Sequence, residues 1–393
     1  MRNILIICNN YSTGKDANGV CAKNVVEQLR REGHNVYIIT EYDKSIERDE
    51  FVNFIKEEKQ RNGFIEKIIK AYNYPNTMKE RAKKYIIMAR KIIQIKNIDI
   101  VISFYKPFDT IFAAYTLKKE FSNVFFVNYH MDILTDPDEP NCFLKLYKCI
   151  KAKMFFKREY RLIDLVLLPM SLSGVYKEIN IEYVDFPLYI KYYSDEKYNT
   201  DFFNHNVINI VYIGTLDYFN RNPHFFFELL KEYNNYNRKK IELHIWGNID
   251  QKVSQMIDGI NVIYHGYIQN KFVRSIQLQA DFILNVSNKI TYNWIPSKIF
   301  DLFSIGKPII NILFNEKDVS IEYFKKYKFY FDITPKYCIS CDEMKNFKEF
   351  ILQNLGRKSE INDLLFEKAM PEYLTAIIWK HEAKFHDKNT YDK

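Results

Sequence analysis

The sequence predicts an α/β protein with two parallel-sheet domains, and three observations support this. Short apolar runs of strand length alternate with helical segments, beginning with NILIIC (3–8). The 393 residues exceed the usual size of one domain. A polar and aromatic stretch without a period, KYYSDEKYNTDFFNHN, separates two sets of elements. We therefore expect one domain over 1–190, a linker over 191–206 and a second domain over 207–370.

The first set opens with a βαβ unit, which implies a parallel sheet with right-handed crossovers. Strand 3–8 leads into a loop with Gly14 and Gly19, a helix ending at Gly33, and the strand HNVYIIT. The remaining elements are expected in this order: a long basic helical region over 56–96, strand 98–104, a helix from about Thr110, strand 124–130, a basic helix over 142–162, strand 162–170 and a short apolar segment at 184–190.

The second set repeats the alternation. Its elements are expected as strand 207–216, helix 225–233, strand 241–247, strand 261–267, helix 271–279, strand 280–287, a helix after Pro296 and strand 308–314. One more helix, PEYLTAIIWKHEAKF (371–385), follows the last strand of this set.

The net charge of +8 is unevenly placed. Residues 56–96 hold twelve Lys/Arg and four Glu, and residues 142–162 hold seven Lys/Arg and one Glu. In the second stretch Phe143, Leu146 and Ile150 recur at helical spacing between lysines. Such a helix either lies on an anionic membrane surface or is a solvated helix packed on its own domain, and both interpretations stay open. No groove-reading motif accompanies the charge, so nucleic acid is not an expected partner.

The chain shows no apolar run long enough to span a bilayer and no signal-peptide cleavage site near its start. We expect a cytoplasmic protein, peripheral on the inner face of the membrane if the basic helices bind lipid. Cys338 and Cys341 form the only Cys-x-x-Cys, and without a second pair they are expected to be reduced thiols. His224, His244 and His265 lack evident carboxylate or cysteine partners, so no metal site is expected.

The segment NWIPSKIFDLFSIGKPII (293–310) carries the most specific signal. Pro296 suits a first helical turn, where its missing N–H is not needed. Ser297 and Lys298 follow at the positive end of the helix dipole, an arrangement that favours an anion and above all phosphate. Gly306 ends the helix.

Small or polar residues also lie at the ends of several strands of the second set. These are Gly214 with Thr215, Gly247, Gly266 and Asn285. Ligands bind at the carboxyl ends of parallel strands, and glycine lets a ligand approach the backbone closely. Together with the helix at Lys298, this pattern predicts a nucleotide site in the second domain.

Three runs, IVYIGTLDYFNRNP, IELHIWGNID with NVIYHGYI, and IPSKIFDLFSIGKPII, resemble the C-terminal half of GT-B fold glycosyltransferases, and more narrowly glycosyltransferase family 4. The resemblance covers most of the chain, but its specific motifs lie within 207–310. It implies two Rossmann-like domains facing across a cleft, with a crossover helix over 371–393 packing back on the first domain. It also implies retaining, metal-independent transfer from a nucleoside-diphosphate sugar.

The expected donor is a UDP- or GDP-sugar used as substrate, with no cofactor or metal. The expected acceptor is a hydroxyl of a glycan or lipid-linked molecule, in the biosynthesis of cell-surface polysaccharide such as capsule or lipopolysaccharide. The donor follows from the resemblance. The basic helices of the first domain suggest the lipid-linked acceptor, and the polysaccharide setting rests on analogy.

The resemblance also assigns roles to residues of the second domain. Ser297, Lys298, Gly214 and Thr215 would hold the diphosphate, and Arg221 is the nearby basic residue. Cationic side chains and a helix N-terminus are needed there because the leaving group gains negative charge and no metal neutralises it.

Other assignments concern the sugar, the ribose and the first domain. Asp301 stands where the family holds the ribose hydroxyls, and Asn293 replaces a family glutamate. Gly247, Asn285 and Asn293 would shape the donor pocket. His130 and Asp132 are the candidates for contact with the donor sugar or acceptor, and Gly19 belongs to the first-domain loop.

Bland alternatives remain for several of these residues. His130 could be a buried histidine without a role, Arg221 a surface arginine, and Gly19 a simple turn residue. At the level of the whole protein, the alternatives are a GT-B fold nucleotide-sugar epimerase or phosphorylase, and a non-catalytic nucleotide-binding subunit. A two-lobed solute-binding protein fits less well, because such proteins are exported and this sequence shows no signal-peptide cleavage site.

Overall fold

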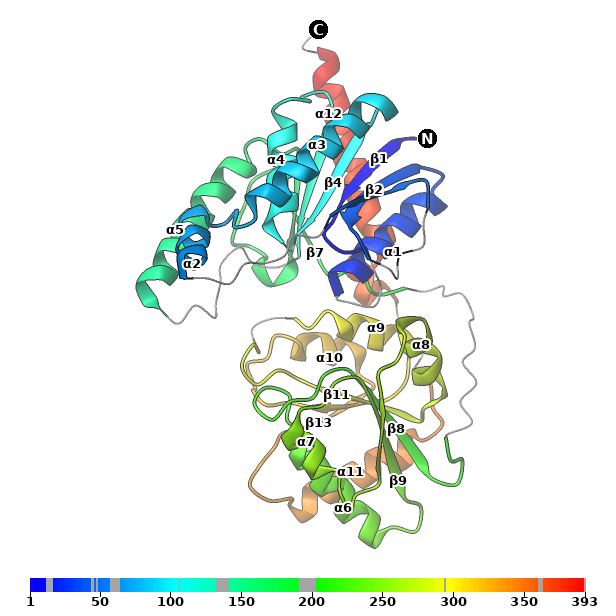
Figure 1. Cartoon of the computed structure of the whole chain (residues 1–393). Helices are drawn as coiled ribbons and strands as arrows, with labels where there is room; N and C mark the ends of the chain where they lie inside the picture. The colour runs from blue at the N-terminus through cyan, green and yellow to red at the C-terminus, as the bar shows by residue number, and fades with distance from the viewer. Residues whose placement is uncertain are drawn as a thin grey trace. The chain divides into compact units, whose positions relative to one another are not determined.

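The computed structural model describes residues 1–11, 17–43, 46, 49–56, 64–105, 107–131, 141–190, 203–292, 295–359 and 363–391, with only the backbone for 64–68, 270 and 388–391. The chain divides into two compact units, Met1–Leu188 with Glu367–Lys393, and Tyr189–Phe366. Each unit contains one sheet whose strands are all parallel (Figure 1). The predicted α/β fold with two parallel sheets is confirmed.

The first sheet has seven strands in the order β3-β2-β1-β4-β5-β6-β7. Their bounds are β1 (Asn3–Ile7), β2 (Asn35–Glu41), β3 (Val52–Ile55), β4 (Ile100–Tyr105), β5 (Phe125–His130), β6 (Leu165–Pro169) and β7 (Ile181–Val184). Strand β3 was not predicted. Strand β7 pairs with β6 and ends at Val184, where the expected segment 184–190 begins. That segment contains Pro187, which has no N–H to donate to a neighbouring strand.

The first unit also contains helices. They are α1 (Ala17–Arg31), α2 (Phe64–Asn73), α3 (Lys79–Lys96), α4 (Phe108–Lys118), α5 (Cys142–Glu159) and α12 (Pro371–Tyr391), with a short 3₁₀ helix η1 (Met170–Leu172). The long basic helical region contains two helices, α2 and α3, and its residues 57–63 lie outside the described residues. Pro75 lies between them, and proline cannot donate the hydrogen bond that would continue α2.

The C-terminal helix α12 belongs to the first unit, where it packs against α1 and β5 (Figure 1). Leu374, Ile377 and Ile378 are buried in this contact. Both carboxylate oxygens of Glu32, just after α1, accept hydrogen bonds from α12: Thr375 Oγ1 donates at 2.7 Å and Trp379 Nε1 at 2.8 Å. The predicted return of the last helix to the first domain is confirmed.

The second sheet has six strands in the order β10-β9-β8-β11-β12-β13. Between β7 and α12 the chain forms, in order, β8 (Ile208–Ile213), α6 (His224–Tyr236), β9 (Ile241–Trp246), α7 (Gln251–Met256), β10 (Val262–Gly266), α8 (Asn270–Gln279), β11 (Phe282–Val286), α9 (Lys298–Ile305), β12 (Ile309–Ile312), α10 (Ile321–Tyr327), β13 (Tyr330–Ile333), α11 (Cys341–Asn354) and the 3₁₀ helix η2 (Asp363–Ala369). Apolar side chains of α6 and α11, such as Phe226 and Phe347, form the main core with one face of this sheet.

Within the described ranges, no helix combines the length and the apolar character needed to cross a membrane.

Candidate functional site

Three glycines lie side by side at the carboxyl ends of β8, β9 and β10. The Gly214 N–H donates to Trp246 O at 2.9 Å, and the Gly247 N–H donates to Gly266 O at 2.8 Å. Gly247 has φ +116°, and a Cβ on it would lie 2.1 Å from the carbonyl oxygen of Gly214. The two backbones therefore touch at this edge with no side chain between them, as a site for a close-lying ligand requires.

Two cationic side chains meet around Tyr212, the penultimate residue of β8. Lys298 Nζ lies 5.0 Å from the centroid of the Tyr212 ring. The buried Tyr212 hydroxyl donates to Thr215 O at 2.8 Å and also bonds the side chain of Arg221. The structure thus brings together Thr215, Arg221 and Lys298, which the sequence assigned to the diphosphate, and Gly214 lies beside the same tyrosine.

The electrostatics of this cluster favour an anion. Burial, and then the positive charge of Arg221, lower the pKa of Lys298 to about 7. In the described part of the chain, neither Lys298 nor Arg221 forms an ion pair with a carboxylate. The two close cations repel each other, so a bound anion would relieve the repulsion and raise the lysine pKa.

Helix α9 positions Lys298. Its buried side chains Ile299, Phe300 and Phe303 fix the helix on the unit, and Gly306 ends it in the left-handed conformation with φ 74°. Ser297 occupies the N-cap position, but its side chain makes no capping hydrogen bond. The backbone itself closes the first turn: the Ile299 N–H donates to Pro296 O at 3.1 Å and the Phe300 N–H donates to Ser297 O at 3.4 Å. These two N–H groups are therefore not free at the helix start, where the sequence predicted free N–H groups.

Arg221 is positioned by a loop that is tied to the end of β11. The Asp217 carboxylate accepts from the backbone N–H groups of residues 219 and 220, which folds the loop on itself. Arg221 Nε donates to Asn288 Oδ1 at 2.7 Å, and Lys289 N donates to Asn220 O at 2.9 Å. Asn288 was missed by sequence reasoning, because nothing in its spacing signals a contact with a loop 67 residues earlier.

Asn285 is the penultimate residue of β11, near the strand end where the sequence placed it. It begins a ladder of polar side chains at matching register on three adjacent strands: Asn285 Nδ2 donates to Asn311 Oδ1 at 2.7 Å, and Asn311 Nδ2 donates to Asp332 Oδ1 at 2.7 Å. Burial raises the pKa of Asp332. The buried Oδ1 of Asn285 has no hydrogen-bond partner in the described part of the unit.

The other predicted residues of the second unit are less informative. Asp301 lies in the first turn of α9 and is partly exposed; its carbonyl accepts from Ser304 Oγ at 2.7 Å. Asn293 falls outside the described residues. Gly14 and Asp132 of the first unit also fall outside them.

His130 ends β5, as predicted, and is buried. Its Nε2 lies 2.7 Å from Glu159 Oε1 at the end of α5. The same Glu159 oxygen accepts from Asn128 Nδ2 at 2.5 Å, and Asn128 Oδ1 accepts from Ser103 Oγ at 2.6 Å. His130 Nδ1 has no hydrogen-bond partner among the described residues. Gly19 is buried in the first turn of α1, directly after the undescribed residues 12–16.

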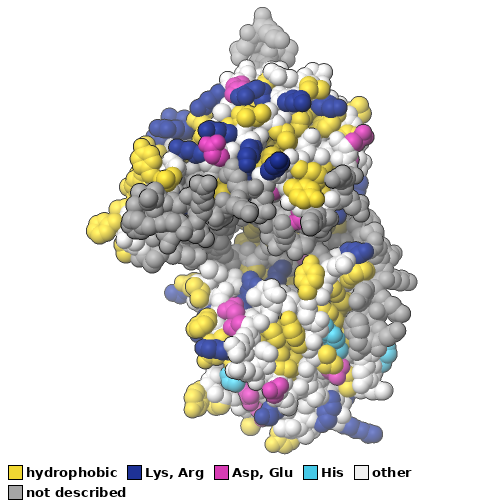
Figure 2. Space-filling model, viewed as in Figure 1, with side chains coloured by type: hydrophobic (Ala, Val, Ile, Leu, Met, Phe, Trp, Pro, Cys, Tyr) yellow, Lys and Arg dark blue, Asp and Glu magenta, His cyan; other side chains and the backbone are white. Residues whose placement is uncertain are grey.

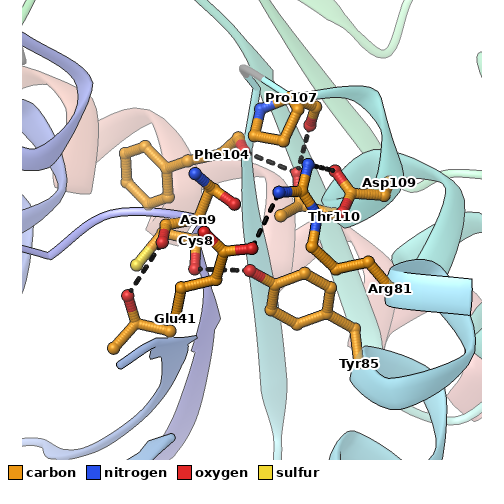
Figure 3. A network of polar contacts seen from close by, with 10 residues as sticks. Cys8, Asn9, Glu41, Arg81, Tyr85, Phe104, Pro107, Asp109 and Thr110 are labelled. Atoms are coloured by element: carbon orange, nitrogen blue, oxygen red, sulfur yellow. Dashed lines mark hydrogen bonds and ion pairs between the residues drawn. The ribbon is translucent and has the colours of Figure 1, made fainter. Parts of the chain in front are cut away.

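A second polar network, which the sequence did not suggest, lies at the carboxyl ends of β1, β2 and β4 (Figure 3). Arg81 of α3 forms ion pairs with Asp109 of α4 and, at 2.7 Å, with Glu41 at the end of β2. Tyr85 donates to Cys8 O at 3.2 Å, and Thr110 donates to Phe104 O at 2.7 Å. Burial raises the pKa of Asp109 although Arg81 opposes the shift. The network ties both helices to the strand ends.

The histidines and cysteines form no metal site in the described part of the chain. No group of three His, Cys, Asp or Glu side chains there lies close enough to hold an ion. His244 Nδ1 lies 2.9 Å from His265 Nε2, and Trp246 stacks on the His265 ring. Burial lowers the pKa of His244 to about 4, so it is neutral at neutral pH. Cys338 and Cys341 are exposed free thiols.

Sequence comparison gives no relatives: no protein-family model and no curated protein sequence matches the chain. Solved structures do match. The UDP-GlcNAc 2-epimerase from Methanocaldococcus jannaschii aligns with a TM-score of 0.55 at 12% identity, over 96% of this chain and 99% of that one. The structure named "Trehalose-6-phosphate from E. coli bound with UDP-2-fluoro glucose" aligns with a TM-score of 0.58 at 11% identity, over 97% of this chain and 99% of that one. The glycosyltransferase SnogD from Streptomyces nogalater gives 0.51 at 12% identity, over 97% and 99%.

At such identities the likeness shows the fold alone. The chain has the GT-B fold, which the sequence predicted, and is structurally similar both to a glycosyltransferase and to a nucleotide-sugar epimerase.

Proposed function

We propose that the protein is a glycosyltransferase that moves a sugar from a nucleoside-diphosphate donor to a hydroxyl of a glycan or lipid-linked acceptor. The observation that carries this proposal is the cation cluster at the end of β8. There Lys298 and Arg221 lie around Tyr212 without a carboxylate partner in the described residues, next to the bare backbone of Gly214 and Gly247.

The cluster fits the chemistry of the proposed reaction. As the bond between sugar and diphosphate breaks, negative charge grows on the leaving phosphate, and donors fixed beforehand stabilise it most effectively. Lys298 and Arg221 would supply charge, and Ser297 would supply a hydroxyl at the positive end of the α9 dipole. In the proposed front-face route the leaving phosphate itself takes the proton of the acceptor hydroxyl. Anomeric retention rests on the sequence resemblance.

The remaining predicted residues take supporting roles in the proposal. Asp301 would accept hydrogen bonds from the ribose hydroxyls, with Gly247, Asn285 and Asn293 around the donor. His130 and Asp132 would contact the donor sugar or the acceptor. In this proposal the enzyme is cytoplasmic and takes part in the biosynthesis of cell-surface polysaccharide, where such donors and acceptors are used.

A thermal-shift screen of nucleoside diphosphates tests the binding half of the proposal. A ligand present at 100 times its Kd should add about 2.7 kcal/mol to the stability of the unit that binds it, which is a rise of about 5–10 °C in Tm. We expect UDP or GDP to give this rise, Lys298→Ala to remove it, and Lys348→Ala, an exposed lysine of α11, to keep it. No shift with any nucleoside diphosphate would refute a diphosphate site.

Incubation with candidate UDP- and GDP-sugars, followed by mass spectrometry and NMR, tests the reaction half. Release of the nucleoside diphosphate, accelerated by an acceptor hydroxyl and lost in Arg221→Met, is the result expected of a transferase. Conversion of the donor to its epimer would instead identify an epimerase, which shares this fold. Binding without either reaction would identify a non-catalytic nucleotide-binding subunit.

A further inference from the structure

Helix α5 exposes an apolar stripe to solvent. Phe143, Leu146, Ile150 and Met154 are 87%, 60%, 50% and 53% exposed, and Tyr147 is also exposed. At 3.6 residues per turn these five side chains fall within an arc of about 100°. Exposed apolar residues scattered singly need no explanation, but a contiguous stripe on one helix marks a surface that another body covers.

The opposite face of α5 is buried in the first unit, so the exposed stripe is not the face by which the helix packs on its own unit. Ala152, Phe156 and Glu159 of α5 are buried against the first unit. Phe156 belongs to the core around the first sheet, and Glu159 bonds His130 and Asn128. The helix is therefore held by one face and presents the other.

The charge on the exposed part of α5 has a single sign. The helix carries five lysines and one arginine, and its one acidic residue is Glu159, which is completely buried. Lys153, Lys157 and Arg158 are exposed and flank the apolar stripe within about one quarter turn. Their aliphatic stems can lie along an apolar surface while the charged groups remain in water.

Helix α2 extends the same surface. Lys151 of α5 donates to the carbonyl oxygen of Tyr72 at 2.5 Å and lies over the Tyr72 ring, so the two helices are neighbours (Figure 1). Ile69 and Tyr72 of α2 are 49% and 72% exposed. Hydrophobic side chains protrude at the left edge of the unit in Figure 2, where Figure 1 places α2 and α5.

We propose that this α2–α5 surface docks the protein on a bilayer that contains anionic phospholipid. The surface consists of Phe143, Leu146, Tyr147, Ile150, Met154, Ile69 and Tyr72 with the lysines and arginine of α5 around them. An apolar stripe bordered by exposed cations such as Lys153, Lys157 and Arg158 matches a membrane interface, where acyl chains take the stripe and lipid phosphates take the cations. The inference does not depend on the proposed transferase activity.

Charge complementarity favours lipid over the other occupants. A second copy of this chain would bring the same cations against these, and the described side chains of α5 offer no exposed carboxylate to pair with them. A polyanion without an apolar phase, such as nucleic acid, would leave Phe143, Leu146 and Ile150 in water. A lipid interface satisfies both halves of the surface at once.

Co-sedimentation of the full-length protein with vesicles tests the proposal. We expect binding to vesicles of phosphatidylcholine with phosphatidylglycerol, much weaker binding to phosphatidylcholine alone, and release at high salt. The variant Lys153→Gln with Lys157→Gln should lower the partition coefficient about thirtyfold, since each basic residue near an anionic surface is worth about a factor of five. The variant Phe143→Ser with Ile150→Ser should lower it by about tenfold or more.

A matched control comes from α11 of the second unit. Leu352→Ser with Lys348→Gln removes one exposed apolar side chain and one exposed lysine from a helix that also carries acidic residues, and it should bind vesicles like the wild type. All changed positions are exposed, so the variants should keep the wild-type Tm. Failure of the wild-type protein to bind anionic vesicles would overturn the proposal, as would equal binding by both α5 variants. A wild-type dimer that Phe143→Ser with Ile150→Ser converts to a monomer would also overturn it, because the surface would then be a subunit interface.

Discussion

Lys298 should take up a proton when a nucleoside diphosphate binds. In the free protein, burial and the charge of Arg221 hold the pKa of Lys298 at about 7. A diphosphate beside the amine favours its charged form and moves the pKa back toward the ordinary lysine value of about 10.4. The protonated form is thus the one that binds, so affinity is full below pH 7 and falls as pH rises through 7.

The size of the effect follows from the same pKa. About half of the free protein has a neutral Lys298 at pH 7, and about nine tenths at pH 8. Binding should therefore take up about 0.5 proton per nucleotide at pH 7 and about 0.9 at pH 8. Between pH 7 and pH 9 the Kd should rise about fiftyfold. The diphosphate contributes little to this change, because its last ionisation, near pH 6, is largely complete in this window.

Isothermal titration calorimetry measures both quantities. Titrations at one pH in buffers of different ionisation enthalpy give the protons taken up per nucleotide, and the pH series gives the Kd. Lys298→Arg supplies the control, because a guanidinium stays protonated throughout this range. We expect Lys298→Arg to bind with little pH dependence and no proton uptake, and Lys298→Met to bind weakly at every pH.

Two results would refute this reasoning. Tight binding by the wild type at pH 8 with less than about 0.1 proton taken up would mean that Lys298 is already charged in the free protein. Undiminished proton uptake in Lys298→Arg would mean that another group titrates. Either result would separate the diphosphate from the pKa of this lysine.

Two further predictions concern stability, measured by urea unfolding. Gly247→Ala should cost about 3 kcal/mol or more because its Cβ would meet a backbone carbonyl at 2.1 Å, whereas Gly259→Ala, with a positive φ but open space, should cost about 1 kcal/mol; equal losses would contradict the close approach of β8 and β9. Arg81→Met should cost about 3–5 kcal/mol because it leaves the buried Asp109 without its partner, and Arg90→Met, which breaks an exposed ion pair on the same helix, should change stability little.

Sequence reasoning succeeded where a single segment carries its own signal. Strands such as β4 and β11 are nearly continuous apolar runs, because strands of a parallel sheet are buried on both faces. Both ends of helix α9 are signalled in the sequence, by Pro296 and Ser297 before it and by Gly306 after it. From these local signals the two sheets, their order along the chain and the position of Lys298 could be predicted.

Contacts between distant segments could not be predicted. Nothing in the sequence pairs Glu159 with His130, or Arg81 with Asp109, because such pairs depend on how a helix is rotated on its sheet. Helix α5 shows the difficulty most clearly. Its apolar period is evident in the sequence, yet the stripe with Phe143 is exposed and the opposite face with Phe156 is buried. Periodicity reveals an amphipathic helix but not which of two apolar faces the fold uses.

The position of α12 determines the order in which the protein can be completed during synthesis. Unit Tyr189–Phe366 is an insertion within the first unit, whose own chain resumes only at Glu367. The inserted unit is continuous and can fold as soon as it leaves the ribosome, while the earlier-made Met1–Leu188 waits for its last helix. Until then, the surface of α1 and β5 that Leu374, Ile377 and Ile378 cover stays open to water. Synthesis that stops before α12 would therefore release a chain whose second unit can fold but whose first unit lacks its last helix.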